Sequence, residues 1–307
     1  MTEKKLSLII PVFNEEENIP NLFGRLSGAL ASWTSNYEII MVNDGSADNT
    51  LTLLINHREQ DNRIKIIDFS RNFGHQAAIL AGITEAEGDY IAILDGDLQD
   101  PPEFLKVLYA KAEEGYDVVY AVRKKRKEGI IKKGLYFTFY RFLNRITQIN
   151  IPLDSGDFGL FTKRVRDEII QAKEHSLFIR GIRSWVGFKQ TGIEYERDKR
   201  HAGEPKFTFK KLFNLAYNGI FSFSDFPIRI LTKLGFYLIL ISIGYTIFSL
   251  VRYFQGNAPT GFTTLAIAIF FFGSVQIFTV GIVGEYVLRT YNESRNRPIY
   301  IINKKYK

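Results

Sequence analysis

The chain of 307 residues contains no cysteine, and it has only two methionines and two tryptophans. The lack of cysteine excludes disulfide bonds, thiolate catalysis and thiolate-bound zinc, and it suits a reducing compartment. No G-x-G-x-x-G follows the first apolar run and no G-x-x-x-x-G-K-[ST] occurs, so the dinucleotide-binding and P-loop fingerprints are missing. The first residues, MTEKKLSLIIPVFNEEE, lack the long apolar segment of a signal peptide, and we expect no export.

Basic residues are unevenly distributed in this chain, whose formal net charge is +7. Lys and Arg crowd the stretch from Arg123 to Arg145, where Glu128 is the one acidic residue, and they recur in the tail from Arg289. Such clusters suit a polyanionic partner, either nucleic acid or an anionic membrane surface. The uncharged segments described next favour a lipid bilayer, and we expect no nucleic-acid partner.

Two long segments in the C-terminal third carry no charged residue. They run from Leu234 to Val251 and from Phe262 to Gly284, and each approaches the roughly 20 residues that span a hydrocarbon core. Two helices buried in a soluble core are the alternative, but the short uncharged turn QGNAPTG between the runs favours a transmembrane hairpin. Both outer flanks are basic, with Arg229 and Lys233 before the pair and Arg289 after it. The positive-inside rule therefore predicts a multi-pass protein of the inner cell membrane with both termini in the cytoplasm.

Short β-branched runs alternate with amphipathic stretches in the N-terminal part, which predicts an α/β fold with a doubly wound, mostly parallel sheet. The predicted strands are LSLIIPVF, YEIIMVND, IKIIDFS, YIAILDGD and DVVYAVR. Ligands of such sheets bind outside the carboxyl ends of the strands. The polar clusters FNEEE, NDGSADNT, SRNFGH and DGDLQD follow the first four strands and should therefore share one site.

Beyond the fifth predicted strand, residues 132–147 and 207–230 mix Phe, Tyr and Leu with Lys and Arg. Helices in a bilayer interface have this composition, as do amphipathic helices that pack on a sheet. The place of the second segment, just before the apolar pair, favours the interface for that segment. We thus expect a cytoplasmic domain over 1–206, an interfacial region over 207–230, transmembrane helices at about 231–254 and 262–288, and a basic cytoplasmic tail over 289–307.

Two carboxylates, Asp95 and Asp97, follow the fourth predicted strand and are separated by a glycine, so both can lean towards one point. Mg²⁺ and Mn²⁺ prefer one or two carboxylates together with substrate phosphates and water. The two residues are therefore candidate metal ligands, with Gln99 as a neutral third, although a D-x-D also occurs in solvated turns. Asp100 precedes two prolines and is predicted to be the N-cap of the next helix.

The clusters after the first two predicted strands also have structural alternatives. Asp44, Gly45 and Ser46 can form only a turn and a helix start, or they can contribute to the shared site. Asn14 is a candidate cap for the helix that follows, while Glu15 is expected to face the cleft.

Two further groups stand later in the chain. Asp157, in DSGDFGLF, can be a general base, a sugar-binding group or a turn residue. A basic cluster precedes the membrane-proximal segment; a glycine and a proline interrupt it and no helical period organises it, so a phosphate-gripping loop competes with a solvated face. Its members are Arg197, Lys199, Arg200, His201 and Lys206.

Taken together, these motifs resemble the family-2 polyprenyl-phosphate glycosyltransferases, which include dolichol-phosphate mannose synthases and bactoprenol glucosyltransferases. The matching stretches are VFNEEENI, VNDGSADNT, FSRNFGHQAAILAGI, ILDGDLQDPPE, AVR, GLF and RHAGEPKF, in this order and followed by two apolar segments. The resemblance covers nearly the whole chain and implies a GT-A fold, a nucleotide-diphosphate-sugar donor, Mg²⁺ or Mn²⁺, and a lipid-phosphate acceptor. By this resemblance we expect an inverting transfer of glucose from UDP-glucose to undecaprenyl phosphate, by an enzyme that forms homo-oligomers.

The resemblance also implies roles for individual residues. Those that match the nucleoside-binding residues are Pro11, Asn14, Glu15 and Asp44, and the nucleotide-binding motifs further include Gly45, Ser46 and Arg71. The metal and diphosphate site is matched by Asp95, Asp97 and Gln99, and the phosphate-gripping residues by Arg123, Arg200 and Lys206. Asp157 falls at the proposed base, so that the expected catalytic residues are Asp157, Asp97 and Arg200.

The chain departs from the family pattern at two positions. Asn43 stands where a second Asp often precedes Asp-Gly-Ser, and Pro205 stands where Ser is common before the lysine. The first departure affects base or ribose contacts, and the second removes a hydroxyl from the acceptor loop.

Two other functions fit parts of the sequence. A processive polysaccharide synthase shares the nucleotide-binding half, but RGIRSW only partly matches the usual Q-x-x-R-W motif, and two helices make a poor channel. A membrane-anchored protein that binds a nucleotide sugar without turnover is the non-catalytic alternative. Such a protein would have no use for Asp95, Asp97 and Arg200 together.

Overall fold

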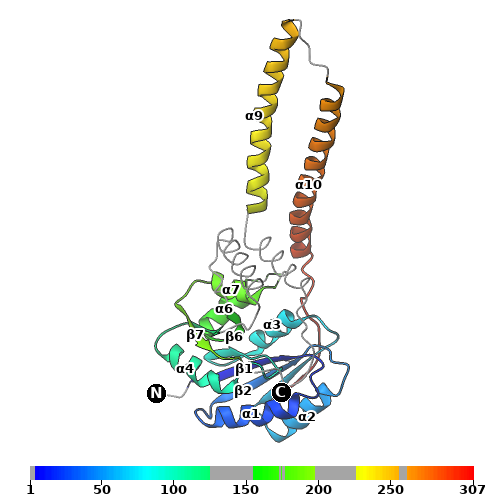
Figure 1. The fold of residues 1–307 in the computed structure, drawn as a ribbon. Helices are drawn as coiled ribbons and strands as arrows, with labels where there is room; N and C mark the ends of the chain where they lie inside the picture. The colour runs from blue at the N-terminus through cyan, green and yellow to red at the C-terminus, as the bar shows by residue number, and fades with distance from the viewer. Residues whose placement is uncertain (1–3, 125–154, 173, 175–176, 198–225, 256–260) are drawn as a thin grey trace. The chain divides into compact units, whose positions relative to one another are not determined.

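The computed structural model describes residues 4–124, 155–172, 174, 177–197, 226–255 and 261–307 (Figure 1). The predicted helix at 132–147, most of the segment 207–230, and both Arg200 and Lys206 lie outside these ranges. The chain divides into two compact units, the first comprising residues 1–145, 149–215 and 297–307 and the second residues 146–148 and 216–296.

The first unit is built on one eight-stranded sheet with the order β7-β5-β6-β4-β1-β2-β3-β8. Its strands are β1 (Leu6–Val12), β2 (Tyr37–Asn43), β3 (Ile64–Phe69), β4 (Tyr90–Ile93), β5 (Val118–Arg123), β6 (Ser155–Thr162), β7 (Gln190–Tyr195) and β8 (Ile302–Tyr306). Neighbours pair in parallel except β6, which is antiparallel to β4 and β5, and β8, which is antiparallel to β3. The five predicted strands and the mostly parallel α/β sheet are confirmed.

Helices cover both faces of this sheet (Figure 1). They are α1 (Ile19–Ala31), α2 (Thr50–Gln60), α3 (His75–Glu85), the 3₁₀ turn η1 (Pro102–Phe104), α4 (Leu105–Glu113), α6 (Lys163–Gln171) and α7 (Ile179–Trp185). Alternate residues of β1 pack against the apolar stripe of α1, in which Leu22 and Leu26 are fully buried. On the other face α3 approaches β1 at Gly82, where an added Cβ would lie 2.3 Å from Ile9 Cγ2. The strands are thus buried on both sides, which explains their continuous apolar sequences.

The antiparallel direction of β6 decides which residues reach the site. Because β6 runs against β4, it starts at the edge of the sheet where the parallel strands end. Ile93 pairs with Gly159, so the residues that precede Gly159 lie beside those that follow Ile93. This register brings Asp157 towards Asp95 although neither residue lies in a parallel strand pair.

The C-terminal strand β8 was not predicted. The sequence predicts a basic tail over 289–307, whereas the structure places Ile302–Tyr306 at the edge of the sheet beside β3. The lysines of this segment hid its strand pattern, because an edge strand tolerates and often uses charged side chains.

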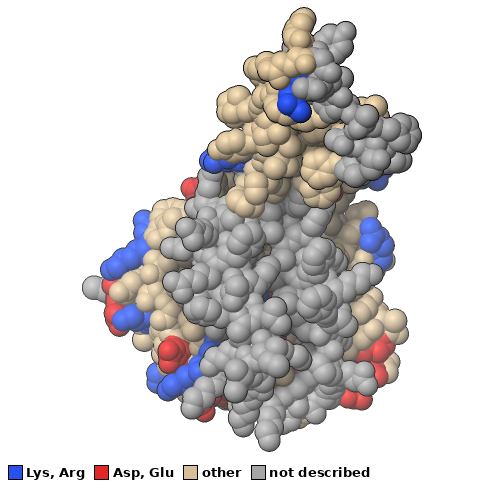
Figure 2. Space-filling view, turned by 45° about the horizontal axis from the view of Figure 1, so that its top comes forward, with Lys and Arg blue, Asp and Glu red and all other residues tan. Residues whose placement is uncertain are grey.

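The second unit contains two long apolar helices, α9 (Phe226–Phe254) and α10 (Phe262–Ser294). The first begins before the predicted start at 231 and the second ends beyond the predicted end at 288. Both are long and apolar enough to cross a membrane, and their apolar windows, Phe226–Tyr245 and Phe271–Ser294, are 6% and 0% buried. Figure 2 shows few charged side chains on their described surface. This exposure is unlike that of helices in a soluble core.

A buried carboxylate at the amino ends of the parallel strands, Glu38, offers a test of the fold. Its Oε1 accepts hydrogen bonds from Ser7 Oγ and the backbone N–H of Glu87, and its Oε2 pairs with Lys65 at 2.8 Å and Lys5 at 3.1 Å. Burial raises the pKa of Glu38, but Lys65, Ser7 and the Glu87 N–H outweigh it and lower the pKa to about 2.

We expect Glu38→Gln to destabilise the protein at neutral pH by up to about 3 kcal/mol, because each pKa unit is worth roughly 1.4 kcal/mol. A lowered carboxylate pKa stabilises the fold above the unfolded-state value of 4.5, and that contribution is lost as the pH falls towards 2. Thermal denaturation from pH 7 to pH 3 measures the difference. The exposed pair of Glu103 with Arg25 supplies a control, Glu103→Gln, with little effect. An equal loss at every pH would contradict the assignment.

Candidate active site

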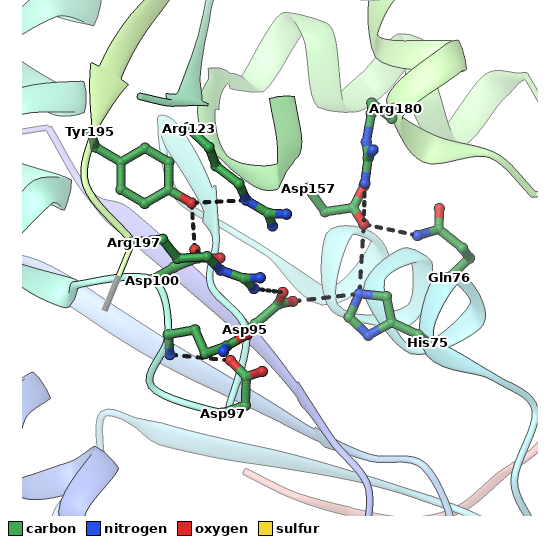
Figure 3. Close-up of polar contacts among 11 residues, drawn as sticks. His75, Gln76, Asp95, Asp97, Asp100, Arg123, Asp157, Arg180, Tyr195 and Arg197 are labelled. Carbon is green, nitrogen blue, oxygen red and sulfur yellow. Dashed lines mark hydrogen bonds and ion pairs between the residues drawn. The ribbon is translucent and has the colours of Figure 1, made fainter. Parts of the chain in front are cut away.

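Three aspartates lie at the carboxyl edge of the sheet, where Asp95 and Asp157 flank His75 and Asp97 stands on the loop beside Asp95 (Figure 3). Asp95 and Asp97 follow β4, and Asp157 is the third residue of β6. His75, the first residue of α3, lies between them: its Nε2 is 3.5 Å from Asp95 Oδ1 and 3.7 Å from Asp157 Oδ2. The imidazole therefore joins Asp95, a predicted metal ligand, to Asp157, the predicted base.

Asp157 is held by several donors. Its Oδ2 accepts hydrogen bonds from Arg180 Nη2 and Gln76 Nε2, both at 3.2 Å. Burial raises the pKa of Asp157, but Arg180 and His75 outweigh it and hold the pKa well below its ordinary value. Oδ1 is buried without a hydrogen-bond partner among the described residues. Asp157 is thus ionised and weakly basic, with one oxygen left to meet a ligand.

Asp95 lies among like charges. Burial raises the pKa of Asp95 to about 6, and Asp100, Asp157 and Asp97 add to the rise while His75 opposes it. Its Oδ1 has no hydrogen-bond partner in the described part of the chain. A carboxylate oxygen of this kind is suited to bind a cation, because a cation would offset both the cost of burial and the repulsion from the neighbouring carboxylates.

The loop is strained directly after Asp97. Leu98 has a positive φ of 58°, which is uncommon for a residue with a side chain. Across this residue, Asp97 Oδ1 accepts a hydrogen bond from the backbone N–H of Gln99 at 3.2 Å. Among the described residues, no three His, Asp or Glu side chains form a complete metal site. Asp95 and Asp97 therefore suit a metal whose remaining ligands come from a substrate and water.

Asp100 is not the predicted N-cap. η1 begins after Pro101 without a side-chain cap, and Asp100 points into the protein with 1% exposure. Its Oδ1 accepts hydrogen bonds from Tyr195 Oη at 2.5 Å and Arg197 Nε at 3.0 Å. The proline pair indicated a helix start correctly, but burial beside two donors from the end of β7 is the stronger constraint on this carboxylate.

Two arginines border these aspartates. Arg197 Nη2 is 4.0 Å from Asp95 Oδ2, so this residue contacts both Asp95 and Asp100. Arg123, the last residue of β5, donates from Nε to Tyr195 Oη at 3.4 Å, as Figure 3 shows. The edge thus holds cationic groups next to the carboxylates, as a site for a diphosphate requires.

The loops after β1 and β2 bind each other. Asn14 does not cap α1; its Oδ1 accepts a hydrogen bond from Ala47 N at 2.8 Å, and its own N–H donates to Ser46 Oγ at 3.0 Å. Glu15 accepts from Asn18 Nδ2 at 2.6 Å. Asn14 has a positive φ of 51°, which its short amide side chain tolerates.

Asp44 joins the loop after β2 to the loop after β3. Its carboxylate accepts hydrogen bonds from the backbone N–H groups of Phe73 at 2.7 Å and Gly74 at 3.0 Å. Gly45 has a φ of +66°, and a Cβ there would lie 2.4 Å from the carbonyl carbon of Arg71. The Arg71 guanidinium stacks over the Phe73 ring at 4.0 Å. Pro11 is buried in β1, where it pairs with Val42.

Five of the contacting residues were not predicted as site residues. They are His75, Gln76, Arg180, Tyr195 and Arg197. SRNFGH had been placed at the site edge without its histidine being chosen, and Arg197 had been named only within the basic cluster. Arg180 stands in RGIRSW, which is noted above only as a partial match to a synthase motif, and Tyr195 has no sequence signal; the roles of both depend on where α7 and β7 pack.

A comparison with known protein families identifies the chain. The model of glycosyl transferase family 2 matches residues 7–170. The chain belongs to glycosyl transferase family 2. It is therefore a glycosyltransferase, and the described first unit supplies the GT-A sheet of that family.

Relatives match this family-2 enzyme over nearly its whole length. "Uncharacterized glycosyltransferase YkcC" of Bacillus subtilis is 44% identical and covers 98% of this chain and 94% of its own. "Prophage bactoprenol glucosyl transferase homolog" of Escherichia coli is 39% identical over 98% and 99%. "Bactoprenol glucosyl transferase" of Shigella phage SfII is 39% identical over 99% of each chain. Among solved structures, Staphylococcus aureus TarS in complex with UDP-GlcNAc has a TM-score of 0.50 and 18% identity, covering 72% of this chain and 67% of its own, which supports the fold.

The close approach at Gly45 can be tested by Gly45→Ala. We expect a loss of stability of about 2 kcal/mol or more, because the new Cβ meets both a positive φ and the Arg71 backbone. Gly115→Ala is a matched control, since Gly115 has a φ of +89° but no atom within 4 Å of the added Cβ. Thermal denaturation of both variants separates the clash from the backbone strain. Equal destabilisation would show that the contact with Arg71 is unimportant.

Proposed function

We propose that this enzyme transfers glucose from UDP-glucose to undecaprenyl phosphate and inverts the anomeric centre. The observation that carries the proposal is the full-length match to proteins named bactoprenol glucosyl transferase, at 39% identity. The convergence of Asp95, Asp97 and Asp157 at the carboxyl edge of the sheet supports it, because ligands of such sheets bind there.

The donor would lie across the loops after β1 to β4. Asp95 and Asp97, with Gln99 beside them, would hold Mg²⁺ or Mn²⁺, which supplies charge neutralisation for the departing nucleotide diphosphate. Arg123 adds a fixed positive charge at the same edge, where it donates to Tyr195 Oη, which in turn donates to Asp100. The nucleoside would be held by Pro11, Asn14, Glu15, Asp44, Gly45, Ser46 and Arg71.

Asp157 would position a substrate instead of removing a proton. The nucleophile is a phosphate oxygen, and a phosphate monoester has a second pKa near 6, so the acceptor is largely dianionic at neutral pH. Arg180 and His75 keep Asp157 a weak base. Its unpartnered Oδ1 is suited to accept a hydrogen bond from the sugar or to orient the acceptor.

The two apolar helices would form a transmembrane hairpin in the inner membrane, with the catalytic unit and both termini in the cytoplasm. The length and exposure of α9 and α10 support a membrane location. The basic residues before and after the pair favour the cytoplasmic orientation. Arg200 and Lys206, outside the described residues, would bind phosphate close to the membrane surface.

The experiment is conversion of labelled UDP-glucose by the full-length protein in nanodiscs with undecaprenyl phosphate and Mg²⁺. We expect a lipid-linked monosaccharide that disappears with EDTA and in Asp97→Asn. A polymeric product would favour a processive synthase. Nucleotide binding without product would favour the non-catalytic alternative. Either result would contradict the proposal, and other nucleotide sugars and phosphoprenols in the same assay define specificity.

The role of Asp157 is tested by Asp157→Asn. We expect kcat to fall less than about tenfold at pH 8 to 9, where the acceptor is fully dianionic. The amide oxygen of the variant can still accept the hydrogen bonds from Arg180 and Gln76. A general base contributes about a hundredfold to ten-thousandfold, so a loss in that range at high pH would show that Asp157 removes a proton. Rates measured from pH 6 to 9 with the wild type in parallel distinguish the two roles.

A further inference from the structure

A buried carboxylate, Asp68 on β3, links three neighbouring strands. It is 4% exposed, and each of its oxygens accepts a hydrogen bond from an asparagine. Asn43 Nδ2 on β2 donates to Oδ1 at 2.7 Å, and Asn303 Nδ2 on β8 donates to Oδ2 at 2.8 Å. Burying a carboxylate costs free energy unless it is hydrogen-bonded, so the two amides are needed to offset the cost of burying Asp68.

The same contacts orient the Asn43 side chain. A carboxylate can only accept, so the amide nitrogen of Asn43 must face Asp68 and its oxygen must face the loop after β2. There Oδ1 accepts a hydrogen bond from Ser46 N at 3.3 Å. Ser46 Oγ accepts from Asn14 N at 3.0 Å. A continuous chain of hydrogen bonds therefore runs from β8 to the loops after β2 and β1.

The family departure at position 43 is consistent with this arrangement. An ionised aspartate at that position would face Asp68 as a like charge and would leave it with one donor fewer. Asparagine supplies the donor that Asp68 needs while keeping an acceptor for Ser46.

The residues just before β8 make a second link. Ser70 N, directly after β3, donates to Ile301 O at 3.0 Å. The Tyr300 ring stacks on Phe69 with centroids 5.1 Å apart, and Phe69 meets Phe73 edge-on at 5.7 Å. The C-terminal segment thus supports the loop after β3, whose backbone N–H groups bind the carboxylate after β2.

We propose that residues 300–303 support the loops of the nucleotide-binding site and that Asn303 is a positioning residue for the donor. The inference rests on the proposed function, because it takes residues 44–46 and 70–74 as the loops that receive the nucleotide. It assigns to the C-terminal strand a role beyond completing the sheet edge. Donor affinity then depends on a contact between residues 235 positions apart, made by the chain after it has left α10.

The test compares Asn303→Leu with Lys305→Leu in the full-length protein in nanodiscs. Both variants place leucine on the same edge strand, but Lys305 pairs with Glu85 at the far end of α3 and has no link to Asp68. We expect Asn303→Leu to weaken UDP binding about five- to tenfold, less than the full effect of one hydrogen bond to a charged group, because Asn303 acts on the nucleotide through the loops. The KM for UDP-glucose should rise by the same factor, while kcat and the KM for undecaprenyl phosphate change less than about twofold.

Lys305→Leu should bind UDP as the wild type does. Unchanged UDP binding in Asn303→Leu, or an equal loss in Lys305→Leu, would overturn the inference. The exchange Asp68→Asn with Asn303→Asp restores a carboxylate–amide pair and should recover most of the UDP affinity lost in Asn303→Leu. Failure to recover it in a variant with wild-type thermal stability would also contradict the inference.

Calorimetric UDP binding needs no turnover, so it separates this inference from the proposed function. A wild type that binds UDP but makes no lipid-linked glucose contradicts the proposed function, and the variants still test the role of Asn303. A wild type that binds no UDP contradicts both.

Discussion

The site depends on the balance of charge where carboxylates are crowded at one edge of the sheet. Asp95, Asp100 and Asp157 are buried or partly buried there, and like charges in such a setting are costly unless cations offset them. Arg180 on α7 and Arg197, which follows β7, offset part of this negative charge. Asp95 is left with a raised pKa, and its Oδ1, 3.5 Å from His75 Nε2, has no hydrogen-bond partner among the described residues, which is the physical basis for expecting a cation.

Topology produces this crowding. β4 ends at the edge where the antiparallel β6 begins, and the pairing of Ile93 with Gly159 continues towards Asp95 and Asp157. The absence of a side chain at Gly156 lets the Arg123 guanidinium approach, since a Cβ there would lie 3.1 Å from Nη2. One strand running against its neighbours therefore brings a third carboxylate to a site that parallel strands alone would build from two.

The loops after β1, β2 and β3, which we propose to hold the nucleotide, are organised by backbone contacts. Asp44 accepts from the N–H groups after β3, so its carboxylate shapes a loop in addition to any contact with a ligand. Asn14 likewise bridges two loops where a helix cap had been predicted. Residues that a family pattern associates with a ligand thus have structural partners as well, and their substitution will alter loop positions together with affinity.

Local patterns were sufficient for the five parallel strands, the two apolar helices and the clustering of polar loops, because strand burial and the period of apolar residues are written in neighbouring positions. The spacing of Asp95 and Asp97 placed both residues after the fourth strand, and their role as metal ligands stays a prediction. The roles of His75, Arg180, Tyr195 and Asp100 were not, since each depends on an element distant in sequence packing against the strand ends. The same reason applies to β8: its charged residues resemble a tail until β3 offers an edge, and only the folded sheet brings Asn303 to Asp68.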